Sequence, residues 1–127
     1  MSGGRQGAGG REEFIRGLLG RSDRAEAFSW LDESTEESYR TLGELATNEQ
    51  SIDLVCAAYR AGASEVIAVE IDTYPDGGQN TGRLLVKLPD DAEKRRRVFA
   101  WCEPWADRLG FTAGEDVGQE YLFVMLD

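Results

Sequence analysis

Carboxylates gather around one turn-rich stretch of the sequence, and carboxylate oxygens are the groups that bind calcium and magnesium in proteins. Asp72 and Asp76 lie in this stretch, and Asp90, Asp91 and Glu93 follow it. Their spacing lacks the alternating ligands of an EF-hand loop, and no glutamate stands where such a loop closes. Turn formation and helix capping explain these residues, so we predict neither a metal site nor a cofactor.

The chain offers little for nucleophilic catalysis. It contains no histidine and no Gly-x-Ser-x-Gly sequence, and its two cysteines are Cys56 and Cys102. An activated nucleophile needs a base beside it. Both cysteines fall on the apolar faces of predicted helices, where small thiols fill a core, although a disulfide is an alternative. The sequence therefore favours a non-catalytic protein over an enzyme.

A basic run and two tryptophans are the other candidates for a binding site. The run spans residues 94–97 and could bind an acidic ligand. On a helix its four side chains point in different directions and have acidic neighbours one turn away, so we interpret it as a solvated helix face. Trp101 and Trp105 are one helical turn apart and could line a pocket, but this spacing is more typical of core packing.

The charge of the chain limits its partners. The formal net charge is −10 over 127 residues, and residues 32–93 carry fourteen acidic and four basic side chains. Because phosphate backbones and anionic membranes repel an acidic surface, we expect no nucleic acid and no membrane as a partner. The sequence has no secretory signal and no apolar run of about 20 residues. We therefore expect a cytoplasmic protein with reduced thiols.

Two segments with a period of two residues organise the fold, and their pattern predicts the strands of a hairpin. The segments span residues 64–72 and 82–88, and residues 74–82 between them are rich in turn formers. We expect one face of this hairpin to meet the helices. That face would carry Ile67, Val69, Ile71, Leu84, Val86 and Leu88.

Helical periodicity flanks the hairpin on both sides. Thr47 and Gln50 match a capping box, which predicts a helix that ends at Gly62. Asp90 is the predicted N-cap of the helix that follows the hairpin. Pro104 interrupts the apolar stripe of that helix, which predicts either a kink or the start of a second short helix.

The strand order gives the predicted fold. Residues 38–45 fit a strand or a continued helix, and we favour the strand. Residues 119–126 form the last predicted strand, which is apolar on both faces and therefore covered on both sides. The order is then βαββαβ, an α+β, ferredoxin-like antiparallel sheet with two helices on one face and a right-handed last crossover. It resembles the order in ferredoxin-like regulatory domains such as the ACT type, which bind amino acids at subunit interfaces; the resemblance implies no ligand residue here.

The N-terminal residues precede this domain as a helical arm. A first short helix covers residues 11–19, and a second one is capped at Ser22 or Asp23 and ends near residue 31. Each is apolar on one face, so it packs either on the same domain or on a partner subunit. The predicted parts are a flexible tail (1–10), the arm with its linker (11–37) and a single α+β domain (38–127).

These features favour a small non-catalytic binding or regulatory module that acts through self-association, as a homodimer, or through a protein partner. The second sheet face is too apolar to stand exposed, so either the N-terminal helices or another subunit must cover it. One alternative is an immunity-type or antitoxin-type inhibitor of a basic partner, and another is a small carboxylate-based enzyme. The sequence specifies no small-molecule ligand. The candidate interaction surface comprises Phe14, Leu18, Phe28, Trp30, Arg83, Leu85, Lys87, Tyr121 and Phe123.

Overall fold

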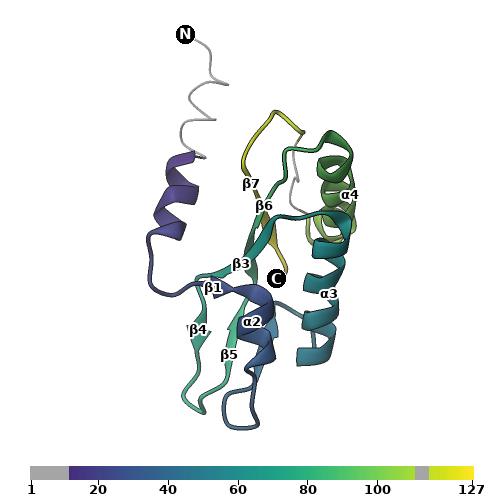
Figure 1. Cartoon of the computed structure of the whole chain (residues 1–127). Helices are drawn as coiled ribbons and strands as arrows, with labels where there is room; N and C mark the ends of the chain where they lie inside the picture. Colours follow the sequence, from purple (N-terminus) through teal and green to yellow (C-terminus); the bar gives the residue numbers. More distant parts are fainter. Residues whose placement is uncertain (1–11, 111–114) are drawn as a thin grey trace.

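The computed structural model describes residues 12–110 and 115–127, so the predicted tail over residues 1–10 lies outside the described part. The chain forms a mixed α+β fold in which a central antiparallel sheet lies between helices (Figure 1). A helix over residues 12–19 lies on one side of this sheet, and α3 and α4 lie on the other. The predicted α+β class is therefore confirmed.

The main sheet has four strands in the order β1-β3-β6-β7, and all neighbours are antiparallel. A second, smaller sheet has the order β2-β5-β4, with β2 parallel to β5 and β4 antiparallel to it. The strands are β1 (Ala25–Glu26), β2 (Arg40–Leu42), β3 (Glu65–Val69), β4 (Asp72–Thr73), β5 (Gln79–Thr81), β6 (Arg83–Lys87) and β7 (Tyr121–Met125). The labelled helices are α2 (Ala27–Asp32), α3 (Asn48–Ala61) and α4 (Ala92–Leu109).

The predicted ferredoxin-like strand order is wrong. Residues 38–45 do contain a strand, β2, but it pairs with β5 in the small sheet and not with the main sheet. No strand separates β6 from β7, which pair directly and antiparallel, so α4 makes no parallel crossover. The other edge of the main sheet, beside β3, is formed by β1. The backbone N–H groups of Arg40 and Leu42 donate to the hydroxyls of Ser34 and Ser51, at 2.9 Å each, which holds β2 away from the main sheet.

The predicted hairpin is real, but it bends in the middle and contributes to both sheets. The bend on its first strand is at Glu70, a non-glycine residue with a positive φ of 54°. Opposite the bend, the hydroxyl of Thr81 donates to the carbonyl of Val69 at 2.5 Å. The hairpin therefore continues as β4 and β5 beyond the main sheet, with its tip at residues 74–78.

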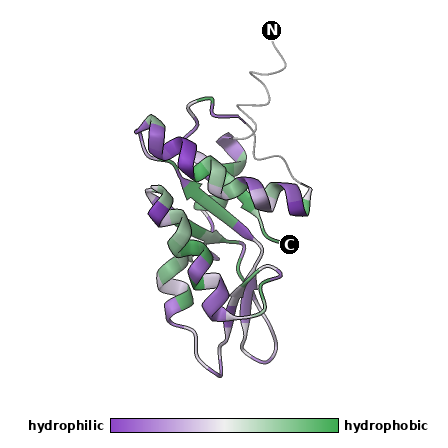
Figure 2. Ribbon diagram, turned by 90° about the vertical axis from the view of Figure 1, so that its right-hand side faces the viewer, coloured by the Kyte–Doolittle hydropathy of each residue, from purple (hydrophilic) through white to green (hydrophobic). Residues whose placement is uncertain are grey.

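The register of the hairpin corrects the predicted faces. Ile67 lies opposite Leu85, and Ala68 lies opposite Leu84. Residues directly opposite each other share a face, so the odd-numbered residues of both strands form one face and the even-numbered residues form the other. The even face packs under α3 and α4, and the odd face packs under residues 12–19. Both faces are apolar, which is why each strand's own alternation could not assign them (Figure 2).

The helices on the even face follow most of the predicted signals. Thr47 and Gln50 form the predicted capping box at the start of α3, and Gly62 follows its last residue with a φ of 124°. The N-cap of α4 is Asp91, which accepts from the N–H of Lys94 at 2.9 Å, and not the predicted Asp90. Pro104 lies inside α4, which continues as a single helix to Leu109.

The second predicted N-terminal helix is shorter than expected. Residues 25–26 form β1 against β3, so α2 begins after Glu26 and not at Ser22 or Asp23. The carboxylate of Glu26 caps α2 by accepting from the N–H groups of Phe28 (3.0 Å) and Ser29 (2.7 Å). Side chains of α2 are buried in the same core as α3 and α4. The division into an arm (11–37) and a domain (38–127) stays a prediction about independent folding.

The helix over residues 12–19 covers the odd face of the main sheet from within the same chain. Ile15 and Leu18 are buried against Ile67, Val69 and Leu85. Of the two predicted ways to cover this face, the described chain therefore uses its own N-terminal helix. None of the helices in the described residues is long and apolar enough to cross a membrane.

Candidate functional site

Three residues of the predicted interaction surface are buried within the chain. Leu18 and Leu85 belong to the packing between residues 12–19 and the sheet. Trp30 is buried in the main core, and its indole N–H donates to the side-chain oxygen of Gln79 at 2.9 Å. The guanidinium of Arg40 lies 5.8 Å from the Trp30 ring centroid. These side chains position the N-terminal elements and offer no free surface.

The exposed aromatic members lie on two separate parts of the molecule. Phe14 is 49% exposed and meets the half-buried Phe123 edge to face, with ring centroids 5.2 Å apart. Phe28 is 38% exposed and belongs to α2. Whether these side chains bind a partner stays a prediction.

The two charged members of the predicted surface form ion pairs on the sheet. Arg83 lies 3.4 Å from the carboxylate of Glu70, the residue at the bend of the hairpin. Lys87 lies 3.8 Å from the carboxylate of Glu120. All four side chains are at least partly exposed, so these pairs are screened by solvent and contribute little to stability.

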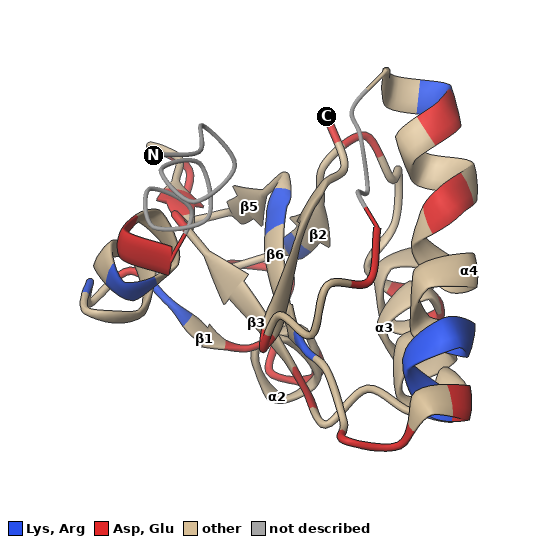
Figure 3. Cartoon of the chain, turned by 90° about the horizontal axis from the view of Figure 1, so that it is seen from above, with Lys and Arg blue, Asp and Glu red and all other residues tan. Residues whose placement is uncertain are grey.

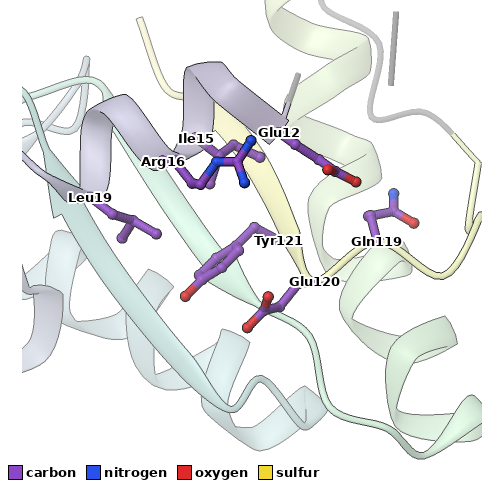
Figure 4. Close-up of a pocket in the computed structure, with 7 residues that line it drawn as sticks. All are labelled: Glu12, Ile15, Arg16, Leu19, Gln119, Glu120 and Tyr121. Carbon is purple, nitrogen blue, oxygen red and sulfur yellow. The ribbon is translucent and has the colours of Figure 1, made fainter. Parts of the chain in front are cut away.

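A pocket of about 260 Å³ lies between the N-terminal helix and the start of β7 (Figure 4). The side chains of Ile15, Leu19 and Tyr121 give it an apolar lining. Glu12 and Arg16 extend over it from the helix. Of the residues that line this pocket, only Tyr121 belongs to the predicted interaction surface. The other lining residues could not be predicted from the sequence, because the pocket forms only when the helix docks on the sheet. The remaining lining residues are Gln119 and Glu120.

A second pocket of about 230 Å³ lies over the small sheet, and its polar wall has a structural explanation. The amide of Gln79 accepts from Trp30 and donates to the hydroxyl of Thr73 at 2.9 Å. Both ends of this amide are therefore already engaged. These hydrogen bonds join α2 to β4 and β5. The remaining polar lining comes from Ser22, Asp23 and Arg24, of which Asp23 pairs with Arg21.

The far end of the small sheet is strongly acidic. Two segments meet there: the connection after α2 and the hairpin tip. The N–H of Gln79 donates to the carbonyl of Tyr39 at 2.8 Å, and a Cβ at Gly77 would lie 2.6 Å from the carbonyl oxygen of Glu37. These two segments, with the ends of α2 and β4 that lead into them, carry six exposed carboxylates, and none of the six forms an ion pair within the described residues. We call this group the acidic end: Asp32, Glu33, Glu36, Glu37, Asp72 and Asp76.

Two tyrosines stand among these carboxylates. Tyr39 is 46% exposed and Tyr74 is 48% exposed. The hydroxyl of Tyr39 accepts from the N–H of Asn48 at 2.9 Å, which fixes its orientation. Neither tyrosine was predicted as a site residue, although both lie in acidic stretches, because only the pairing of β2 with β5 brings those stretches together.

The basic run forms one stretch of α4 (Figure 3), but its arginine side chains have different surroundings. Arg95 turns inward, where its guanidinium lies 2.6 Å from Asp116 and also donates to the carbonyls of Pro89 and Gln119. Arg96 and Arg97 pair with Glu93 on the exposed helix surface. The interpretation as a solvated face holds for these two, whereas Arg95 is a structural residue.

Cys102, Trp101 and Trp105 of α4 pack in the main core, whereas Cys56 of α3 is only partly buried. Cys102 is fully buried, and burial raises the pKa of its thiol to about 11, so the group stays a protonated thiol at neutral pH. Both cysteines are free thiols. The indole N–H of Trp101 donates to the carbonyl of Leu54 at 3.2 Å, which joins α4 to α3. Across residues 12–110 and 115–127, no three acidic or thiol groups are arranged to hold a metal ion.

No protein-family model, no curated protein and no solved structure matches the chain. Of the features described above, the acidic end combines exposure, charge without an internal partner and exposed aromatic side chains.

Proposed function

We propose that the chain is a non-catalytic binding module whose acidic end docks on the basic surface of a protein partner. The observation that carries this proposal is the group of six exposed carboxylates around Tyr39 and Tyr74. Uncompensated charge of one sign attracts a surface of the opposite sign and accelerates association.

The two tyrosines give this surface a means of holding the partner after the first encounter. Tyrosine is enriched among the residues that dominate binding energies, because a rigid ring buries a large area and its hydroxyl still forms hydrogen bonds. At 46% and 48% exposure, Tyr39 and Tyr74 retain much of their surface for such contacts. The carboxylates would then set the orientation of the partner and the rate of association, and the tyrosine rings would slow dissociation.

A module of this kind neutralises or regulates the protein that it covers. The partner is a protein with clustered lysine or arginine side chains, as in an inhibitor of the immunity or antitoxin type. A nucleic acid would be repelled by the same carboxylates. The proposal needs no catalytic group in this chain.

The test compares two variants with the same change in charge. The first neutralises four carboxylates of the acidic end, as Glu36→Gln, Glu37→Gln, Asp72→Asn and Asp76→Asn. The second neutralises four exposed carboxylates on α3 and α4 and serves as the control; its substitutions are Glu49→Gln, Asp53→Asn, Glu103→Gln and Asp107→Asn.

Each protein is used to capture partners from an extract of the source organism, and the affinity for the recovered protein is then measured by calorimetry at low and high salt. We expect the first variant to bind at least about tenfold more weakly and the control to bind like the native chain. Tyr74→Ala should weaken binding without changing its salt dependence. Equal losses in both four-site variants, or binding that is insensitive to salt, would overturn the proposal.

A further inference from the structure

The two edges of the main sheet are formed by the short strand β1 and by β7. The N–H of Leu126 donates to the carbonyl of Gly82 at 2.7 Å, and the N–H of Leu88 donates to the carbonyl of Glu120 at 2.8 Å. In an antiparallel pair the hydrogen-bonded positions alternate, so the even-numbered residues of β7 bond to β6. The N–H and C=O groups of Tyr121, Phe123 and Met125 therefore point away from the sheet.

Nothing in the described part of the chain pairs with these outward groups along residues 121–125. The edge of the small sheet at β2 is protected, since the hydroxyls of Ser34 and Ser51 accept from the backbone N–H groups of Arg40 and Leu42. β7 has no such device: it contains no proline, no charged residue and no glycine.

We propose that β7 pairs with β7 of a second copy of this chain, which joins the two main sheets across a two-fold axis at Phe123. An antiparallel pair centred there places Phe123 opposite its own copy and Tyr121 opposite Met125. The outward N–H and C=O groups of these residues then meet those of the second copy, so the edge is complementary to itself.

The side chains beside this edge fit a second copy. Tyr121, Phe123 and Met125 are half-buried, and Phe14 stands next to Phe123. The two-fold axis brings two such aromatic pairs together, which adds apolar contact to the backbone hydrogen bonds. It also places Glu120 opposite Leu126, so the like charges of the two copies do not face each other.

This contact is separate from the acidic end, which belongs to the small sheet. A partner bound at the acidic end and a second copy at β7 can therefore be tested independently. Loss of one contact leaves the other intact, so failure of one proposal is not failure of the other.

The oligomeric state gives the first test, by light scattering behind size exclusion over a wide range of concentration. We expect the native chain to reach twice the monomer mass. Met125→Pro removes an outward N–H group that forms no hydrogen bond to β6, so we expect the fold to tolerate the substitution. The loss of this donor should raise the dissociation constant of the dimer about tenfold or more. Met125→Leu keeps the N–H and should dimerise like the native chain. A native chain that stays monomeric throughout overturns the proposal, as does Met125→Pro that folds and still dimerises fully.

A second pair of variants keeps the test decisive if proline disturbs the strand. Met125→Lys places a charge at the edge and should leave a folded monomer, because lysine at an edge opposes pairing. Phe28→Lys is the matched control, since Phe28 is a 38% exposed apolar residue on α2 and lies outside the proposed contact. The proposal is wrong if Phe28→Lys abolishes the dimer as completely as Met125→Lys does.

Cross-linking tests the register. In a Cys56→Ser background, a mixture of Tyr121→Cys and Met125→Cys should be joined by a short bismaleimide, because the paired Cα atoms lie about 5.5 Å apart. Tyr121→Cys alone should not cross-link, since four residues separate the two copies by about 14 Å along the strand. Cross-linking of Tyr121→Cys alone, or none in the mixture, would contradict the two-fold axis at Phe123.

Discussion

The hydroxyl of Tyr59 on α3 lies 2.6 Å from the carboxylate of Glu26 at the end of β1. The same phenolic oxygen accepts from the N–H of Val66 at 3.0 Å, so it joins α3 to two strands of the main sheet. Glu26 also caps α2. One contact between residues 33 positions apart in the sequence thus holds α2, α3, β1 and β3 together.

Removal of that hydroxyl should destabilise the fold. Tyr59→Phe leaves the buried Val66 N–H without its acceptor and deprives Glu26 of a donor, and we expect a loss of about 2–3 kcal/mol in the free energy of unfolding. Urea denaturation checks this value. In a double-mutant cycle with Glu26→Gln, the two losses should be strongly non-additive. Simple additivity would show that the two side chains do not act together.

The same contact predicts how stability depends on pH. Burial opposes the charged form of Glu26, but the hydrogen bonds from Tyr59, Ser29 and Phe28 outweigh it and lower the pKa of this carboxyl. A lowered pKa in the folded state contributes stability above the unfolded value of about 4.3, and that stability is lost as the pH falls through the folded pKa. Burial, followed by the hydrogen bond to Glu26, raises the pKa of Tyr59 to about 12. The stability that Tyr59 contributes to the fold is complete below about pH 10 and is lost as the pH rises towards about 12.

Denaturant unfolding from pH 3 to pH 11 measures both limbs of this dependence, and Tyr59→Phe provides the comparison. The variant should lose the alkaline limb that Tyr59 supplies, and its acid limb should be shallower because the pKa of Glu26 moves back towards its ordinary value. A variant whose stability follows the native pH profile at both ends would contradict the assignment of these shifts to the Tyr59–Glu26 contact.

The loop before β7 gives an independent prediction. The hydrogen bond from Arg95 and a backbone N–H from Gly118 lower the pKa of Asp116 to about 2. Replacing Arg95 with glutamine should raise this pKa towards the ordinary value of 3.8 for an aspartate and release the loop, because the guanidinium also holds the carbonyl of Gln119. Carboxyl chemical shifts followed by NMR would show the rise. An unchanged pKa would mean that the backbone contact alone holds Asp116.

The extent to which the sequence predicts this structure depends on how local each signal is. Thr47 and Gln50 are three residues apart, and their capping box was predicted correctly because both partners belong to one helix turn. The strand β7 was predicted to be covered on both sides, because its apolar residues occupy consecutive positions; its even-numbered residues are buried and its odd-numbered residues are half-buried. Local patterns of this kind depend on no distant part of the chain.

The errors concern relations between distant segments. Alternation within β3 could not show which of its apolar faces meets α3, because that depends on the register with β6. The three residues of β2 carry too little pattern to choose between two sheets. Tyr39 and Tyr74 become neighbours of the same carboxylates only when β2 pairs with β5. The acidic composition of this region was readable in the sequence, but its concentration at one end of the molecule was not.

Two glycines in different surroundings give the last prediction. Gly43 has a φ of +50°, and a Cβ there would lie 2.1 Å from the carbonyl oxygen of Leu126. Gly43→Ala must therefore shift the backbone between β2 and the end of β7, and we expect a loss of about 2–3 kcal/mol in the free energy of unfolding. Gly17 is exposed in the N-terminal helix, and a Cβ there would meet nothing within 4 Å. Gly17→Ala should instead stabilise the chain by up to about 1 kcal/mol, because alanine favours the helix. Thermal and urea unfolding of the two variants should move in opposite directions, and a destabilised Gly17→Ala would mean that this helix does not dock on the sheet as described.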